Sequence, residues 1–285
     1  MPAWARPGDV QRDVDAGYEE SIPENGLGYD DLMEDRDYLF RLINTIDWEA
    51  QLRAIKGVLG RNRAASQAVS KAIDDLQHES ETYRGPHHEQ IVDEWVDAVS
   101  SASYSEAANS MSAIGMIMPM LESIHSQAFY SLGELYAAKG MGPPAHKRWD
   151  RAVAHPQRWN CQVYFDADGT AGTDIIRGIR QISAATGLAP FLASDTADWI
   201  DAMLTYRNKM FHGGFEWSLE QRARFARQIE ARHWEHFFSA ATTDEEPWIF
   251  YVRKEVIAEM PSRIEAILDS WGAFVKGLPF ECGHQ

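Results

Sequence analysis

The sequence predicts an all-α protein, and two observations support this fold class. From residue 31 onward, apolar side chains recur every three or four residues, which is the spacing that buries one face of a helix. We find no stretch of alternating apolar and polar residues long enough to build a sheet. Hydrophobic residues make up 45% of the chain and charged residues 25%, which is typical of a globular protein with a packed core.

The helical pattern and the distribution of charge divide the chain into three regions. We expect an acidic, irregular N-terminal arm over residues 1–30, an N-terminal helical region over 31–104 and a helical domain over 105–285. Residues 1–49 hold 13 acidic and 4 basic residues, so the arm repels itself and stays extended. We interpret the arm as a solubilising tail, and the alternative is an acidic flap that covers a basic cleft.

Within these regions, glycines and prolines mark the expected ends and kinks of helices. A first helical pattern ends at Gly57 and Gly60. The longest and most apolar pattern covers residues 105–139, with a kink at Pro119, and such a helix is usually central in its bundle. Residues 140–172 predict a long ordered connection, because they are rich in Gly, Pro and single aromatic residues. The other expected helices cover 61–83, 88–100, 173–186, 195–212, 218–239 with a capping box at Ser218 and Gln221, and 249–275.

Composition excludes several classes of protein. The chain of 285 residues holds 43 acidic and 27 basic residues, a formal net charge of −16, which argues against a general binder of duplex DNA but is compatible with a small basic cleft. Cys161 and Cys282 are too few and too far apart for a disulfide framework or a cysteine-based zinc site. The most apolar stretch, residues 111–121, is far shorter than the roughly 20 residues of a membrane helix, and the first residues lack the apolar core of a signal peptide. We therefore expect a cytoplasmic protein with no membrane association, no metal and no cofactor.

An arginine interrupts the apolar stripe of the helix expected over residues 195–212. Residues such as Trp199 and Met203 follow the spacing of a core-facing helix, and Arg207 stands in the same stripe. Because an arginine does not lose its charge, burying it unpaired costs several kcal/mol. Either an acidic partner meets Arg207, or the stripe opens onto a cleft at this point.

A histidine stands at the end of the same helix. His212 precedes Gly213 and Gly214, which form a normal helix stop, and the helix dipole favours its protonated form. Asn208 lies one turn earlier on the same face, where its amide can orient the imidazole by a hydrogen bond. Arg207 lies about 140° around the helix from His212, so the two groups converge only through a long side chain or a helix end that unwinds at the glycines.

The segment Arg207-Asn208-Lys-Met-Phe-His212 resembles the R-x4-6-H motif of HEPN (higher eukaryotes and prokaryotes nucleotide-binding) domains. The resemblance covers about residues 105–275, and within them only the six-residue motif is specific. It implies a HEPN-like helical bundle, here with additional N-terminal helices, and a metal-independent endoribonuclease. It also implies a toxin or antiphage defence context and a homodimer in which two motifs face one cleft. Single-stranded RNA, a second copy of the chain, and an antitoxin or other defence-system protein are the expected partners.

The bare pattern R-x4-6-H occurs twice more in this chain, and local context separates the three copies. Arg148 to His155 lies in the expected connection, and Arg227 to His233 lies among alternating charges typical of a solvated helix face. Only Arg207 combines an apolar stripe, a following asparagine and a helix that ends at glycine.

The resemblance also implies roles for individual residues. Arg207 would clamp the scissile phosphate, His212 would transfer the proton, and Asn208 would position His212 or a phosphate oxygen. Residues 204–236 carry a net charge of +2, so we expect RNA-binding residues there: Lys209, Arg222 and Arg224.

Two inward residues of the 105–139 helix are candidates for supporting the site. Glu122 is a natural partner for Arg207, either within the RNA site or as the neutraliser of a structural arginine, and the sequence favours neither account. His125 shares the inward stripe, but a lone inward histidine is more often a core residue.

Two other functions compete with the nuclease. A catalytically silent HEPN-like module would bind RNA, a nucleotide or a protein as a sensor. A phosphohydrolase would use Asp166 and Asp168, but that chemistry needs a parallel sheet that the sequence does not predict, and we favour a polar turn. His87 and His88, beside a Gly-Pro break, are also better explained by a surface turn than by a metal site.

Overall fold

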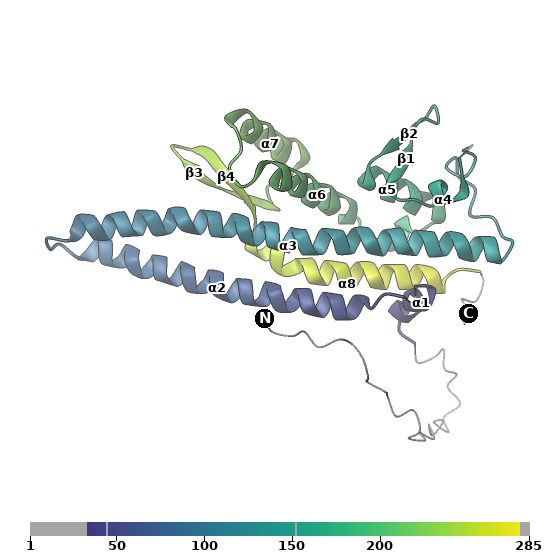
Figure 1. Cartoon of the computed structure of the whole chain (residues 1–285), viewed down its shortest axis with the longest axis horizontal. Helices are drawn as coiled ribbons and strands as arrows, with labels where there is room; N and C mark the ends of the chain where they lie inside the picture. Colours follow the sequence, from purple (N-terminus) through teal and green to yellow (C-terminus); the bar gives the residue numbers. More distant parts are fainter. Residues whose placement is uncertain (1–32, 44, 152, 280–285) are drawn as a thin grey trace, which may run out of the picture. The chain divides into compact units, whose positions relative to one another are not determined.

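The computed structural model describes residues 33–43, 45–151 and 153–279, and these residues are mainly helical, as predicted (Figure 1). The acidic arm over 1–30 and Cys282 lie outside the described residues. In chain order the elements are α1 (Asp35–Leu42), α2 (Trp48–Thr82), α3 (His88–Ala138), α4 (His155–Arg158), β1 (Val163–Phe165), β2 (Ala171–Thr173), α5 (Ile175–Thr186), the 3-10 helix η2 (Ala189–Phe191), α6 (Thr196–Gly213), α7 (Leu219–Arg232), β3 (Phe238–Thr243), β4 (Glu246–Val252) and α8 (Lys254–Lys276).

Helices α2 and α3 are longer than predicted. The prediction of a break at Gly57 and Gly60 is wrong, since α2 continues through both glycines. The expected helices over 88–100 and 105–139 form the single helix α3, which contains residues 104 and 105. A glycine costs a helix only about 1 kcal/mol relative to alanine, and packing along the helix offsets a cost of that size.

Helix α3 is the centre of the described residues, as expected for its apolar pattern. Figure 1 shows α2 and α8 running along one side of α3, with α5, α6 and the β3–β4 hairpin on the other side. The buried residues of α3 begin at Ala107 and continue to Tyr136, on both sides of Pro119. Their burial favours a continuous helix despite the hydrogen bond that the proline cannot make.

The short helix α1 packs against α8, far away in sequence. Arg36 forms an ion pair with Asp269 at 2.7 Å, and Asp35 forms one with Lys276 at 2.9 Å. Gly272 lets the two backbones approach, because an added Cβ there would lie 2.0 Å from the carbonyl oxygen of Asp35. This contact joins the first and last described helices.

Two small antiparallel strand pairs correct the prediction that the chain forms no strands. Helix α7 ends at Arg232 rather than at residue 239. Residues 238–252 form the β3–β4 hairpin, although residues 238–239 and 249–252 were expected to be helical. Asp244 and Glu245, the two residues of its turn, have φ angles of 51° and 67°. Two left-handed residues produce a turn whose twist matches that of paired strands. The hairpin is anchored to α6 by Tyr206, whose hydroxyl donates to Phe250 O at 2.7 Å.

A buried arginine organises the connection that follows α3. Arg148 is 1% exposed and donates hydrogen bonds to the carbonyl oxygens of Arg158, Asn160 and Val163 and to the side chain of Gln181, at 2.6 to 2.8 Å. The predicted ordered connection is confirmed. Burial lowers the pKa of Arg148 to about 10, so the side chain remains charged at neutral pH.

Among the described residues, no helix combines the length and the apolar character that crossing a membrane requires.

Candidate functional site

Helix α6 carries the residues of the Arg207–His212 motif. Trp199, Ile200, Met203 and Leu204 are buried, which confirms the predicted apolar stripe. The helix continues through Gly213, and Gly214 ends it with a φ of 70° and a hydrogen bond from its N–H to Met210 O. The motif therefore occupies the last helical turns, next to the connection to α7.

Arg207 meets an acidic partner, which is one of the two alternatives that its position in the stripe left open. Its Nη1 lies 2.5 Å from Oε1 of Glu122 on α3. The side chains are 26% and 24% exposed, so the pair lies at the border between core and solvent. Glu122 therefore neutralises Arg207, while part of the guanidinium side chain still reaches solvent. This geometry suits a Glu122 that belongs to an RNA site and equally a Glu122 that only neutralises a structural arginine.

Phe211, the apolar residue directly before His212, is exposed rather than buried. Its side chain is 54% exposed, one helical turn after Arg207, and its ring lies over Gly115 of α3, where an added Cβ would be 3.3 Å from Cζ. Glu122 lies seven residues after Gly115 and thus on the same face of α3. Arg207 and Phe211 therefore place a half-buried cation and an exposed ring side by side along that face.

Arg207 and His212 do not converge in this structure. Because α6 stays wound through Gly213, the two positions keep the helical separation of about 140°. Among the described residues, no hydrogen bond joins His212 to Arg207 or to Asn208. Asn208 and His212 are both exposed.

Asn208, Lys209 and His212 line one hollow of about 290 Å³ between the end of α6 and the start of α7. Trp217 also lines it, and the Nζ of Lys209 lies 5.5 Å from that ring's centroid. Burial, and then the charge of Arg224, lowers the pKa of Lys209. Sequence reasoning missed Trp217, although its place directly before the helix-capping Ser218 could have drawn attention to it.

The other predicted site residues lie in different surroundings. Arg222 donates from Nε to Trp217 O at 2.6 Å, beside the hollow, whereas Arg224 pairs with Glu220 at 2.8 Å on the exposed face of α7. The structure does not bring His125 to the site. It is fully buried, its Nδ1 donates to Leu121 O at 3.1 Å, and its ring packs near those of Phe129 and Trp271.

Asp166 and Asp168 form the turn between β1 and β2, as predicted. Asp168 accepts hydrogen bonds from the backbone and side chain of Thr170, which lower the pKa of its carboxyl group, and Asp166 pairs with Arg177 at 2.6 Å. The described strands form only antiparallel pairs, so they do not provide the sheet that the phosphohydrolase would need. In the described part of the chain, no group of three or more His, Cys, Asp or Glu residues is arranged to hold a metal ion.

Comparison with known proteins adds no relative: no family model, curated protein or solved structure matches the chain.

Proposed function

We propose that the protein is an endoribonuclease of HEPN type, which cleaves single-stranded RNA without a metal ion. The observation that carries this proposal is the clustering at the end of α6. His212 and Asn208 line a hollow with the ammonium group of Lys209, and Arg207 stands one turn earlier at the border of the core. A histidine as proton acceptor and two cations are groups that suit phosphoryl transfer with an internal nucleophile.

In the proposed reaction, a ribose 2′-oxygen attacks the adjacent phosphorus, and the bond from phosphorus to the 5′-oxygen of the next nucleotide breaks. His212 takes the proton from the 2′-hydroxyl, and a protonated histidine or water delivers a proton to the departing 5′-oxygen. Arg207 stabilises the negative charge of the transition state through its planar fork. The products are a 2′,3′-cyclic phosphate and a 5′-hydroxyl end.

The divergence of Arg207 and His212 within one chain supports a site shared by two copies. A two-fold axis beside α6 would place Arg207 of one copy opposite His212 of the other, so the shared cleft would hold two sites, each with both groups. Phe211, exposed beside Arg207, offers a surface on which an unpaired base can stack. A neutralising antitoxin or other defence-system protein would bind over this cleft.

Cleavage of an end-labelled single-stranded RNA in EDTA tests the activity. We expect His212→Ala and Arg207→Ala to lose at least about 100-fold in rate, since each removes a group that acts in the transition state. His78→Ala, an exposed histidine on α2, is the matched control and should retain full activity. RNA that is bound but not cleaved by the wild type would instead establish the catalytically silent module.

Mixing the two inactive variants tests the shared cleft. If each of the two sites in the cleft combines Arg207 of one copy with His212 of the other, a mixed dimer of His212→Ala and Arg207→Ala contains one intact site. About half of the dimers are mixed after full exchange, so roughly a quarter of the wild-type activity should return. No recovery, with mixed dimers demonstrated by native mass spectrometry, would contradict the shared cleft without affecting the assignment of His212.

A further inference from the structure

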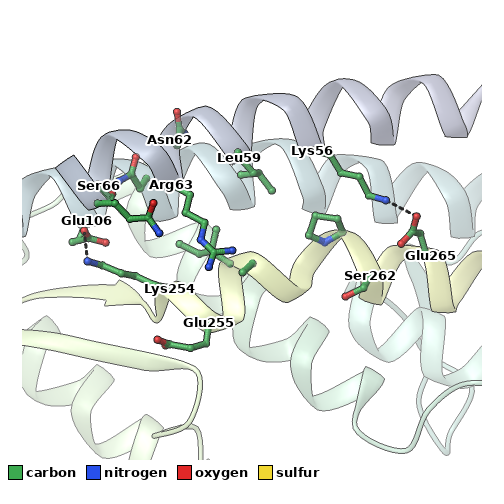
Figure 2. A pocket seen from close by; sticks show the side chains of 16 residues that line it. Lys56, Leu59, Asn62, Arg63, Ser66, Glu106, Lys254, Glu255, Ser262 and Glu265 are labelled. Atoms are coloured by element: carbon green, nitrogen blue, oxygen red, sulfur yellow. Dashed lines mark hydrogen bonds and ion pairs between the residues drawn. The ribbon is translucent and has the colours of Figure 1, made fainter. Parts of the chain in front are cut away.

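A second and larger cavity lies away from the Arg207–His212 motif, between α2, α3 and the first turns of α8 (Figure 2). Its volume is about 590 Å³, within the range of about 300–1,000 Å³ typical of small-molecule sites. None of its lining residues belongs to the proposed RNA site. It therefore needs an explanation of its own.

The apolar part of this cavity is aliphatic. Leu59 of α2 and Ile257, Ala258 and Pro261 of α8 line it. The described lining residues include no aromatic ring, so the cavity offers no stacking platform for a nucleobase. Its walls suit a saturated chain or another aliphatic body.

The charged side chains around the cavity leave one cation without a partner. Lys56 pairs with Glu265 at 2.5 Å, and Lys254 pairs with Glu106 at 3.2 Å, as the dashed lines in Figure 2 show. No hydrogen bond or ion pair holds the guanidinium group of Arg63 among the described residues.

The orientation of the two remaining charged residues differs. Arg63 points from α2 toward α8 across the cavity, and Glu255 points away from it (Figure 2). The unpaired charge that faces the cavity is therefore positive, in a chain whose formal net charge is −16. A guanidinium group presents a planar fork that matches a carboxylate or phosphate group.

We propose that this cavity binds a small amphiphilic anion. Its carboxylate or phosphate head is held by Arg63, and its aliphatic body lies against Leu59, Ile257 and Pro261. Small-molecule sites commonly combine apolar surface with a few placed polar groups, in which the apolar surface provides most of the affinity and the polar groups set the orientation. Here the aliphatic residues would provide the first contribution and Arg63 the second. The proposal concerns a site separate from the nuclease motif and does not depend on RNA cleavage.

Titration calorimetry of the full chain with octanoate, octyl phosphate and octan-1-ol tests the proposal at fixed ionic strength. We expect at least one of the two anions to bind at millimolar concentration or below, and octan-1-ol to bind about tenfold more weakly. Arg63→Gln should reduce the affinity for the anion about tenfold and leave that for octan-1-ol unchanged. Arg61→Gln, an exposed cation two residues earlier that does not line the cavity, is the matched control and should bind like the wild type.

A cavity-filling variant tests the aliphatic part. Gly60 lines the cavity, and no atom lies within 4 Å of a Cβ added there, so Gly60→Phe should block all three probes while the chain stays folded. Gly57→Phe, one turn earlier and beside Arg61 instead, should leave binding unchanged.

Tighter binding of octyl phosphate than of octanoate assigns a phosphate head, and the reverse order assigns a carboxylate. Absence of binding for every probe, or wild-type affinity in both Arg63→Gln and Gly60→Phe, would overturn the proposal.

Discussion

The two parts of α3 differ in burial, although they belong to one uninterrupted helix. No side chain is buried between residues 88 and 106, whereas residues from Ala107 to Tyr136 form much of the core. The difference begins where α8 starts, since Lys254 in its first turn contacts Ser70 and Glu106. The part before Ala107 packs mainly against α2 and stays half-exposed, whereas full burial begins where α8 and strand β4 also cover α3.

The largest expected effect compares the same substitution in the two parts. Ile117→Ala should lower the free energy of unfolding by about 2–5 kcal/mol, because Ile117 is fully buried and the truncation leaves a cavity. Ile91→Ala, in the half-exposed part, should cost about 1 kcal/mol or less. Urea denaturation measures both values, and equal losses would show that the part before Ala107 is as tightly packed as the core.

A pH-dependent stability is expected from the buried part. Burial lowers the pKa of His125 to about 4, compared with 6.5 for an exposed histidine. Between these two pH values, only the unfolded chain takes up a proton at this residue. Stability is therefore complete above about pH 6.5 and falls as the pH drops toward 4, with a loss on the order of 2 kcal/mol between about pH 7 and pH 5.

Denaturation at several pH values isolates this contribution. His125→Gln should flatten the dependence between about pH 7 and pH 5, whereas His88→Gln, at the half-exposed start of α3, should keep it. An unchanged slope in His125→Gln would assign the acid sensitivity to other groups.

A smaller loss is expected where the connection after α3 packs against the helix. An added Cβ at Gly133 would lie 2.7–2.8 Å from ring atoms of Trp159, which is itself buried. Gly133→Ala should therefore destabilise the fold by about 1–3 kcal/mol, despite the better helix propensity of alanine. A thermal melt at or above the wild-type temperature would mean that the Trp159 ring moves aside without cost.

The smallest expected effect has the opposite sign. In α2, Gly60 has open space around its Cβ position, so Gly60→Ala should stabilise the protein by about 0.5–1 kcal/mol through helix propensity alone. Urea denaturation measures this gain. A loss of stability would show that the backbone at Gly60 departs from ordinary helix geometry in solution.

Much of the helical fold could be predicted from local pattern. The apolar stripe of α6 and the capping box at Ser218 follow from residue type and spacing, and the structure confirms them. The pairing of Arg207 with Glu122 is one of the two alternatives that the sequence left open. The predicted boundary at residue 104 lies inside α3, three residues before the first buried residue of that helix, Ala107. The apolar residues of α3 become more frequent near residue 105 because the helix becomes buried there. From the sequence alone, that change in composition looks the same as the end of one helix and the start of another.

The remaining features depend on contacts between distant segments. The β3–β4 turn uses Asp244 and Glu245 in left-handed backbone conformations, where glycine or asparagine would have signalled a hairpin. Arg148 resembled any loop arginine, because three of its four acceptors are backbone carbonyls, which carry no sequence signature. The separation of Arg207 and His212 depended on whether the helix end unwinds, which residue spacing alone does not decide.

The packing of α1 against α8 has a consequence for the order in which the protein matures. Arg36 and its partner Asp269 are 233 residues apart in the chain. At a translation rate of about 5–20 residues per second, roughly 10–50 seconds separate their synthesis. During that interval Leu39, which is fully buried in the finished fold, lacks the surface that covers it. A nascent chain that stalls before α8 therefore exposes its first helix to chaperones and proteases.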